Sequence, residues 1–336
     1  MPRLSTSASA FTGTFAGINS SRTLNVSKRR LMKFAVSVGL PILRVGTQSS
    51  EHAVALANYK AMAMKCAIDF TKDDFALPID YLQLDPTEKV NISFWSGMVF
   101  AALVADEYLK VSRLLHAASF KQGGHLTTTG TAGRSLADFV GQDRDGNWHV
   151  VEAKTRQGTS SANARAKWKT QAETVDKIQG LTPSSRSYAL TNVESLYSVE
   201  LVDPPASNSA STTITFSDLN NAICQGYYGP LYEWLLGTEP MALPESRREV
   251  VIRLAGYDTT EREYIHIGLT YGTWDSLNRN ELPEVVPAQE TTDTYIGSDG
   301  IIIFTSPNPD LLSSFTVKDD TPAPFTKQVM DRKTSP

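Results

Sequence analysis

The sequence predicts an α/β protein in which a mixed β-sheet is flanked by helices. The chain has 336 residues, of which 41% are hydrophobic and 20% charged, the composition of an ordinary globular protein. This length suits one compact core with added parts, or two domains. Segments with a hydrophobic period of about 3.6 residues alternate with segments of period 2, the patterns typical of helices and of strands.

The first part of the chain predicts helices. Residues 1–27 are rich in Ser, Thr and Ala and predict a poorly ordered N-terminus, and residues 28–90 predict a helical region. Within that region Glu51–Ala67 contains neither Gly nor Pro and predicts one helix. The apolar stretch Ile92–Leu115 predicts a long and mostly buried helix that leads into the middle of the chain.

The middle of the chain, residues 91–205, predicts a core in which strands surround a further helix. The period changes to 2 after residue 124, and a helical composition rich in Ala, Lys and Gln returns only at Ser160–Gln179. The predicted strands are Ser135–Gln142, Asn147–Lys154, Ser187–Asn192 and Tyr197–Asp203, and His125–Thr131 is expected as a polar strand or loop.

A domain boundary is predicted at Pro204–Thr212, because this segment is low in apolar residues and rich in Ser and Pro. Residues 206–317 beyond it predict an α+β region. Residues 318–336 are charged and contain Pro, which predicts a disordered tail. The elements expected in the α+β region are helices at Ser217–Gln225 and Pro230–Leu236, strands at Glu249–Ala255 and Tyr264–Tyr271, and a hairpin at Tyr295–Thr305 that turns at Asp299-Gly300.

Charge and cysteine content limit the function classes. The formal net charge is −4 and the pI about 5.8, so any contact with nucleic acid must come from a local basic patch. Cys66 and Cys224 have neither CxxC nor metal-ligand spacing, which argues against a disulfide framework or a zinc site and favours a reducing cytoplasm. No apolar run approaches the roughly 18 residues of a membrane span, so we expect a soluble protein.

Several common catalytic patterns are missing from the sequence. It contains no Walker A and no GxGxxG motif, which argues against a motor or a dinucleotide-dependent enzyme. There is also no nucleophile elbow or other Ser-His-Asp pattern, so a serine hydrolase is disfavoured. The remaining chemical signal lies in one predicted hairpin.

The turn of that hairpin is the segment Asp143-Arg144-Asp145-Gly146-Asn147. Asp in the first place and Gly in the fourth predict a type I turn closed by a glycine in the left-handed region, which makes a three-residue loop with a bulge. This turn fixes a register in which Asp138 faces Glu152. A two-residue turn at Asp145-Gly146 would instead put Asp138 on the opposite face from Glu152.

The three-residue loop brings charged side chains to one face, because side chains alternate along a strand. Asp138, Glu152 and Lys154 then project to the same side. Phosphodiester hydrolysis needs a hard cation held by oxygen ligands, and Asp138 and Glu152, helped by the backbone carbonyl of Ala153, could hold Mg²⁺ or Mn²⁺. Lys154 could position or deprotonate the attacking water, or stabilise negative charge on the phosphate. The residues alone leave both roles of Lys154 open.

The two strands read Leu136-Ala137-Asp138-Phe139-Val140-Gly141 and Trp148-His149-Val150-Val151-Glu152-Ala153-Lys154. With the helix and polar strand before them and the basic helix and strand after them, they resemble the PD-(D/E)XK (restriction-endonuclease-like) nuclease superfamily. The similarity covers roughly residues 95–203. The Pro that usually precedes the Asp is Ala137 here, a departure that leaves the expected metal ligands in place.

This resemblance implies a restriction-endonuclease-like mixed sheet and an Mg²⁺-dependent endonuclease. It would cleave DNA rather than RNA, in defence, restriction or repair. In the family the helix before the first strand often supplies a further acid, and the helix after the hairpin a Gln or Lys. The residues implied here are Glu107, with Asp106 or Glu51 as alternatives, and Gln171.

A local basic patch is expected after the hairpin. Arg156, Arg165, Lys167 and Lys169 follow Lys154, and Glu173 is the first acid afterwards. Cations clustered in this way are typical of phosphate contacts in nucleic-acid-binding proteins. We therefore expect these four residues to bind the backbone of a nucleic acid.

Two other interpretations remain open at this stage. A member of the same fold without catalytic activity could act as a nucleic-acid-binding or protein-interaction subunit, with Lys154 and the basic helix as anchors. Alternatively, the chain could be a structural adaptor whose hairpin charges are merely solvated. For a nuclease, the C-terminal region would serve target choice, formation of a homodimer or contact with an accessory protein.

Overall fold

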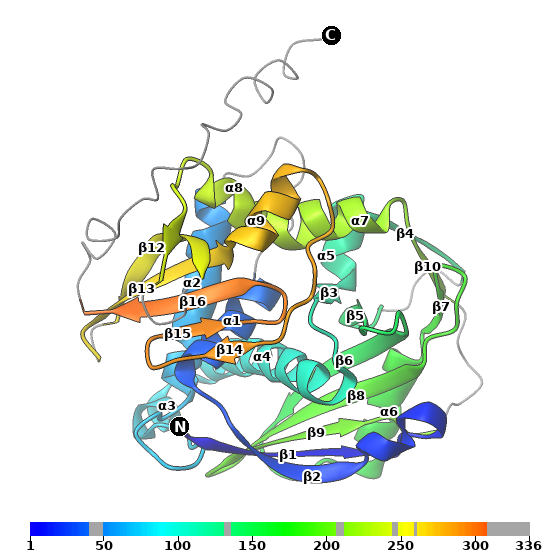
Figure 1. The fold of residues 1–336 in the computed structure, drawn as a ribbon. Coiled ribbons are helices and arrows are strands. Elements are labelled where there is room, and N and C mark those ends of the chain that lie inside the picture. Colours follow the sequence, from blue (N-terminus) through cyan, green and yellow to red (C-terminus); the bar gives the residue numbers. More distant parts are fainter. Residues whose placement is uncertain (40–49, 131–135, 206–211, 244–247, 259–260, 308–336) are drawn as a thin grey trace.

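The computed structural model describes residues 1–39, 50–130, 136–205, 212–243, 248–258 and 261–307. In these residues helices cover both faces of a large mixed sheet, and a second large sheet lies beyond the helices on one side (Figure 1). The α/β class predicted from the sequence is confirmed. The predicted tail, residues 318–336, lies outside the described residues.

The larger of the two sheets carries the predicted hairpin. Its described strands follow the order β2-β1-β9-β8-β6-β5-β3. Strands β3, β5 and β6 are antiparallel neighbours, β6 and β8 run parallel, and β8 and β9 are antiparallel. The bounds are β1 Arg3–Ser9, β2 Ser20–Asn25, β3 Leu114–His116, β5 Phe139–Gln142, β6 Trp148–Arg156, β8 Ser185–Val193 and β9 Tyr197–Val202.

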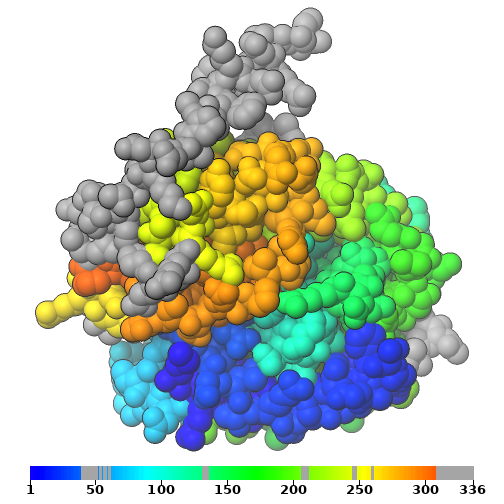
Figure 2. Space-filling model, in the orientation of Figure 1, coloured from blue at the N-terminus to red at the C-terminus, as the bar shows by residue number. Residues whose placement is uncertain are grey.

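The N-terminus corrects the prediction that residues 1–27 are poorly ordered. Strand β1 pairs in parallel with β9 and antiparallel with β2, and a 3-10 helix, Gly13–Ile18, joins β1 to β2. Leu4, Thr6 and Ala8 are buried on one face of β1. Backbone hydrogen bonds to a distant strand hold this polar segment, a pairing that local composition does not reveal. Figure 2 shows the N-terminal segment, in blue, across the lower part of one face.

The register of the β5–β6 hairpin is the one predicted. Phe139 pairs with Val151 and Gln142 with Trp148. Gly146 has a φ of 84° and donates its N–H to the Asp143 carbonyl (3.2 Å), so residues 144–146 form the expected three-residue loop. The Asp143 carboxylate also accepts the N–H groups of Asp145 and Asn147. This turn is closed by its own side chain, which explains why its sequence was informative.

The long helix before the hairpin begins and ends earlier than predicted. Helix α4 (Pro86–Val104) begins at an Asp85–Glu88 capping box and continues as a π-helical turn, Ala105–Leu109. Lys110, with a φ of 59°, ends it in the left-handed conformation. The end of the predicted helix Ile92–Leu115 is therefore wrong, because β3 begins at Leu114 and pairs with β5.

A three-stranded sheet corrects two further predictions. It has the order β4-β10-β7, with bounds Leu126–Thr129, Thr212–Phe216 and Val175–Ile178. The segment His125–Thr131, expected as a polar strand or loop, contains β4, which lies in this sheet and not in the sheet that carries β5. The predicted helix Ser160–Gln179 ends at Ala172 in α6 (Ala162–Ala172), and β7 follows it. Strand β10 lies beyond the predicted domain boundary and still pairs with β7.

The other large sheet is formed by the C-terminal region and has the described order β11-β12-β13-β16-β15-β14. Its predicted hairpin turn at Asp299-Gly300 is present, since Gly300 has a φ of 79° and its N–H bonds to the Gly297 carbonyl (2.9 Å). The bounds are β11 Met241–Ala242, β12 Glu249–Asp258, β13 Glu263–Thr270, β14 Gln289–Glu290, β15 Thr294–Ile296 and β16 Ile301–Ser306.

Helices fill the space around and between these sheets. Helix α1 contacts both α4 and the C-terminal sheet, whereas α6 packs on β6 and β8 (Figure 1). The remaining helical bounds are α1 Lys28–Gly39, α2 Ser50–Ala67, α3 Ile79–Gln83, α5 Ala117–Gln122, α7 Leu219–Asn221, a π-helix at Ala222–Tyr228, α8 Gly229–Leu235 and α9 Tyr271–Asn278.

One hydrophobic core runs through the described parts of the chain. Leu4 of β1, Val151 of β6 and Ile267 of β13 all belong to the same cluster of buried side chains. The segment Pro86–Leu109 is long and apolar enough to span a membrane by length and composition, yet 67% of its apolar 18-residue window is buried inside the protein. Such burial is that of a helix in the centre of a fold.

Candidate metal centre

Strand β6 presents its charged residues to the side of the sheet that α6 covers. Lys154 contacts Gln171 of α6, and the Arg156 guanidinium lies 5.8 Å from the ring centroid of Trp168 in the same helix. Thr155 projects the other way and donates its hydroxyl to the Ser93 carbonyl of α4 (2.8 Å). Glu152, Lys154 and Arg156 therefore share one face, as their alternation requires.

Asp138 and Glu152 lie side by side through reciprocal hydrogen bonds. The backbone N–H of Asp138 donates to Oε2 of Glu152 (3.1 Å), and the backbone N–H of Ala153 donates to Oδ2 of Asp138 (2.9 Å). The Glu152 carboxylate is thus held by the backbone of Asp138, and the Asp138 carboxylate by the residue that follows Glu152. The predicted register brings the two acids together.

Lys154 completes a group of one cation and two acids. Its ammonium pairs with Oε1 of Glu152 and donates to Oε1 of Gln171 at 3.2 Å. The Lys154 side chain is 23% exposed, whereas that of Glu152 is fully buried. Solvent therefore reaches this group from the lysine side, and α6 holds the lysine in place through Gln171.

The electrostatics of Glu152 reflect this crowding. Burial, and secondly the charge of Asp138, raise the pKa of Glu152 from its ordinary value to about 7, although Lys154 acts in the opposite direction. Two acids facing one ammonium leave the site short of positive charge. A divalent cation would supply that charge.

The donor set fits a hard cation with open positions. The N–H and C=O groups of one strand residue point to the same side, so the Ala153 carbonyl is directed toward the strand edge that Asp138 occupies. Two carboxylates and a carbonyl suit Mg²⁺ or Mn²⁺, which keep water and phosphate oxygens as further ligands. Within the described ranges, no group of three or more His, Cys, Asp and Glu side chains is placed to hold a metal.

The structure places Glu107 away from this group, which corrects the expectation that it serves as a further acid of the site. Its carboxylate pairs with Arg30 (3.0 Å) and with Arg22 (3.5 Å) of β2. Strand β2 is the edge strand four positions from β6 in the sheet. Adjacent strands lie about 4.8 Å apart, so this position is roughly 19 Å away. Glu107 instead links α1 and β2 through these two ion pairs.

Asp106, one alternative to Glu107, is also engaged elsewhere. It accepts a hydrogen bond from the Ser298 hydroxyl (3.2 Å) in the C-terminal region. Burial raises the pKa of Asp106, although the nearby charges of Lys33 and Arg30 act against that rise. The side chain of Glu51, the other alternative, lies outside the described side chains.

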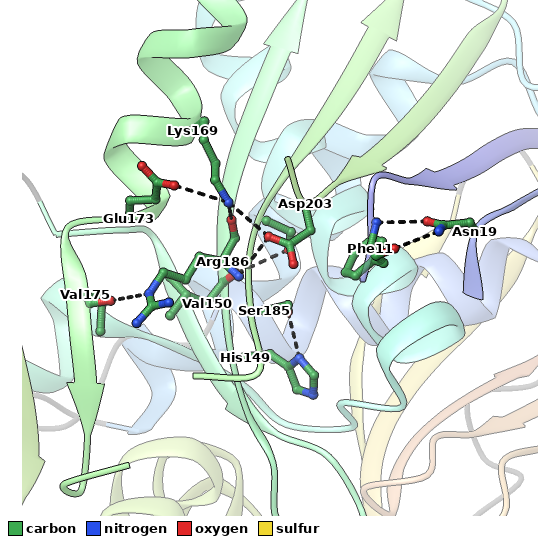
Figure 3. Close-up of polar contacts among 11 residues, drawn as sticks. Phe11, Asn19, His149, Val150, Lys169, Glu173, Val175, Ser185, Arg186 and Asp203 are labelled. Carbon is green, nitrogen blue, oxygen red and sulfur yellow. Dashed lines mark hydrogen bonds and ion pairs between the residues drawn. The ribbon is translucent and has the colours of Figure 1, made fainter. Parts of the chain in front are cut away.

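Lys169 is a buried structural residue, which corrects its assignment to the phosphate-binding patch. Its ammonium contacts Asp203 (3.1 Å), Glu173 (3.6 Å) and the carbonyl of Arg186 (2.9 Å), and only 7% of the residue is exposed (Figure 3). Two acids neutralise this cation beneath α6. It cannot also contact a phosphate without leaving them.

The other three basic residues remain near the surface. Arg165 forms an ion pair with Glu200 (2.8 Å), which reduces its availability to an outside anion. Arg156 and Lys167 are exposed, and Arg156 lies two residues beyond Lys154 on the same face. The local basic surface beside the site therefore consists of fewer cations than the sequence predicted.

Two aromatic residues near the site were not anticipated. Tyr188 of β8 pairs in register with Glu152 and is 2% exposed, and Trp168 of α6 packs edge-on against Tyr188 (5.8 Å between centroids). Tyr188 therefore lies beside Glu152 in the sheet, and Trp168 of α6 packs against it. Their position could not be predicted from the sequence, because the contact depends on the crossover between β6 and β8.

A Ser–His–Asp chain lies at the other end of β6. His149 Nδ1 is 2.8 Å from Ser185 Oγ, and His149 Nε2 is 3.2 Å from Asp143 Oδ2 (Figure 3 shows the Ser185–His149 contact). His149 and Ser185 are 0% and 3% exposed, and burial lowers the pKa of His149. No substrate can reach a serine so enclosed, and the chain joins the hairpin turn to β8.

Comparisons with protein-family models, with curated proteins and with solved structures give no match to this chain.

Proposed function

We propose that this protein is a metal-dependent endonuclease with a restriction-endonuclease-like core, acting on DNA in preference to RNA. The observation that carries the proposal is the convergence of Asp138, Glu152 and Lys154 on one partly exposed position of the β5–β6 hairpin. Oxygen ligands for a divalent cation beside a nearby ammonium group suit metal-assisted phosphodiester hydrolysis. The defence, restriction or repair setting remains part of the same proposal.

The arrangement of elements supports the proposed core. Helix α4 is followed by the antiparallel strands β3, β5 and β6, then by helix α6 and the parallel strand β8. The resemblance to the PD-(D/E)XK superfamily rests on this succession of helix, strands, basic helix and strand, except that β3 takes the place of the polar segment His125–Thr131, whose strand β4 lies in the three-stranded sheet. The site lies on the strand in the middle of that unit.

In the proposed reaction, Asp138, Glu152 and the Ala153 carbonyl would hold Mg²⁺ or Mn²⁺. The bound cation would polarise a phosphate oxygen and lower the pKa of a coordinated water. Lys154 already donates hydrogen bonds to oxygen atoms of Glu152 and Gln171, so its ammonium can hold a water or a phosphate oxygen in the same position. Gln171 fixes the lysine from α6, and Arg156 lies further along the same face for a flanking phosphate.

A binding role without cleavage is the second candidate function. The observation that favours it is the direct ion pair of Lys154 with the fully buried Glu152, which occupies both groups. In that case Arg156 and Lys167 would contact a nucleic acid, and the two carboxylates would serve only to order the hairpin. The two candidates differ in what removal of Glu152 would do.

The test is cleavage of plasmid, single-stranded DNA and RNA by the full chain with Mg²⁺ or Mn²⁺. We expect cleavage by the wild type and a loss of about 100-fold or more in Glu152→Gln and in Lys154→Met, because each removes a group that acts on the reacting phosphate. Asp145→Asn is the matched control, since it removes an exposed acid from the same hairpin.

Two outcomes decide against the proposed active site. One is the absence of nicking on all three substrates with both metals, and the other is cleavage that persists in Glu152→Gln. Salt-sensitive DNA binding that survives Glu152→Gln, without cleavage by the wild type, would establish the binding role instead.

A further inference from the structure

A pocket of about 360 Å³ lies at the start of β6, away from the carboxylates. It is enclosed by the end of β5 and its turn, by β3 with the residues before it, by α7 and the following π-helix, and by the segment after α9. Trp148 in its wall lies four residues before Glu152, or about 13 Å along the strand. The volume falls in the range of roughly 300–1,000 Å³ found for small-molecule sites.

Arg113 gives this pocket a buried positive charge. The residue is 9% exposed, and its guanidinium donates to the Tyr228 hydroxyl (2.8 Å) and to the Pro283 carbonyl. Both acceptors are neutral, and Arg113 forms no ion pair with a carboxylate in the described part of the chain. Asp299 acts on Arg113 only from a distance and already pairs with Lys33 (2.9 Å). A buried guanidinium without a contacting anion is costly to maintain.

A second cation stands at the rim. Arg144, at the first position of the hairpin loop, is exposed and lines the same pocket. The one acid in the lining, Asp143, is occupied by the N–H groups of Asp145 and Asn147 and by the side chain of Asn147 (2.9 Å). The lining therefore offers two guanidinium groups and no uncommitted carboxylate.

The remainder of the wall is mainly apolar. Leu115, Ile223 and Leu282 face the pocket together with Trp148, whose ring stacks on Phe216 with 5.7 Å between centroids. An apolar body can lie against these side chains while its charged group reaches the arginines. Planar guanidinium groups bind carboxylates and phosphates through paired hydrogen bonds.

We propose that this pocket binds a small organic anion, in which a phosphate or carboxylate contacts Arg113 and Arg144 and an apolar group packs against Leu115, Ile223 and Leu282. The ligand would join the hairpin turn to the C-terminal region, since Leu282 belongs to the segment after α9. Ligand binding at this pocket would stabilise the base of the strand that carries Glu152.

The test uses the full chain without divalent metal, so it does not depend on nuclease activity. Binding of adenosine monophosphate, of benzoate and of inorganic phosphate is measured by calorimetry and by the shift in Tm. We expect one of the organic anions to bind saturably and at least about 10-fold more tightly than inorganic phosphate, because phosphate lacks the apolar contacts. Binding of adenosine monophosphate would indicate a nucleotide ligand, and binding of benzoate would indicate a carboxylate ligand.

Two variants test whether the ligand binds in this pocket. Arg144→Gln at the exposed rim should weaken binding five- to tenfold, and Leu282→Trp should abolish it by filling the space, with Tm of the free protein unchanged in both. Arg3→Gln, which removes an exposed arginine from β1, is the charge-matched control and should bind as the wild type does. The proposal is overturned if neither organic anion binds saturably, or if binding is unchanged in Arg144→Gln and Leu282→Trp.

Discussion

Two lysine–carboxylate pairs in this protein differ in how far they are exposed to solvent. Lys33 and Asp299 lie 2.9 Å apart with side chains 1% and 0% exposed, and the Tyr227 hydroxyl also donates to Asp299 (2.7 Å). Lys154 and Glu152 pair at the hairpin, where the lysine is 23% exposed. The first pair joins α1 to the C-terminal hairpin, and the second opens to solvent.

The charge balance of the two groups differs as well. Asp299 and its neighbour Asp106 are compensated by Lys33 and Arg30. Glu152 lies beside Asp138, and within the described residues the cation that pairs with Glu152 is Lys154. Burial of a charged pair is therefore weak evidence for a functional site, whereas two acids against one accessible cation indicate a position that favours an added positive charge.

Removal of one charge from the sealed pair should have the largest effect. We expect Asp299→Asn to lower the free energy of unfolding by about 3–5 kcal/mol, because it leaves the buried Lys33 without its contacting partner. Denaturant unfolding checks this. Asp74→Asn, which breaks an exposed ion pair with Arg3, should cost less than about 1 kcal/mol. Equal losses in the two variants would remove the contrast between the buried and the exposed pairs.

The Glu152 pair should respond to pH in the opposite sense from a stabilising ion pair. The pKa of Glu152 is raised in the folded state to about 7 from an ordinary 4.5, so its contribution to stability is fully present below pH 4.5 and is lost as pH rises through 7. At about 1.4 kcal/mol per pH unit the difference corresponds to about 3 kcal/mol.

The variant Glu152→Gln should therefore gain stability relative to the wild type between pH 4.5 and 8, by up to about 3 kcal/mol, as Tm measured across this range would show. The wild type and Asp145→Asn should keep a constant difference over the same range. A constant difference for Glu152→Gln as well would mean that the pKa of Glu152 is not raised in the folded protein.

Divalent metal should reverse that loss of stability at the hairpin. At a concentration tenfold above its Kd, Mg²⁺ or Mn²⁺ bound only by the folded protein contributes about 1.4 kcal/mol, which should raise Tm. The rise should be larger at pH 8 than at pH 5, because the cation needs the ionised form of Glu152. The same rise in Glu152→Gln would place the bound metal elsewhere in the protein.

The smallest effects should come from the surface cations. Arg156→Gln should lower DNA affinity several-fold and reduce the slope of log K against log salt by about 0.9, the value for one phosphate contact. Arg165→Gln should change the slope less, because Glu200 already neutralises that residue. Filter binding over a range of salt concentrations compares the two. A larger effect at Arg165 would mean that the ion pair with Glu200 opens on binding.

The part of the site that could be predicted is the part set by neighbours in sequence. Asp143 and Gly146 determine the hairpin turn through their own backbone contacts, so the pairing of Asp138 with Glu152 followed from a short segment. The helix after the hairpin was recognised, and Gln171 lies on the correct side of it.

What could not be predicted depends on contacts between distant segments. The acids that neutralise Lys169, including Asp203 on β9, approach it only after the sheet is assembled. Glu107 was assigned by its place in a helix, but its partners Arg22 and Arg30 come from the N-terminal region. Arg113 stood inside a predicted helix, so its pocket gave no sequence signal.

The parallel pairing of β1 with β9 also has a consequence for synthesis of the chain. Ser5 pairs with Ser198, so β1 leaves the ribosome long before its partner strand exists. Such long-range pairing closes a large loop and is slow compared with the local hairpin of β5 and β6. During that interval the edge of β1 that later pairs with β9 is open to pairing with other chains. A fusion partner or bulky tag attached before Arg3 would therefore lower the yield of folded protein by hindering the pairing of β1. It would change the hairpin site less, because that site lies on other strands.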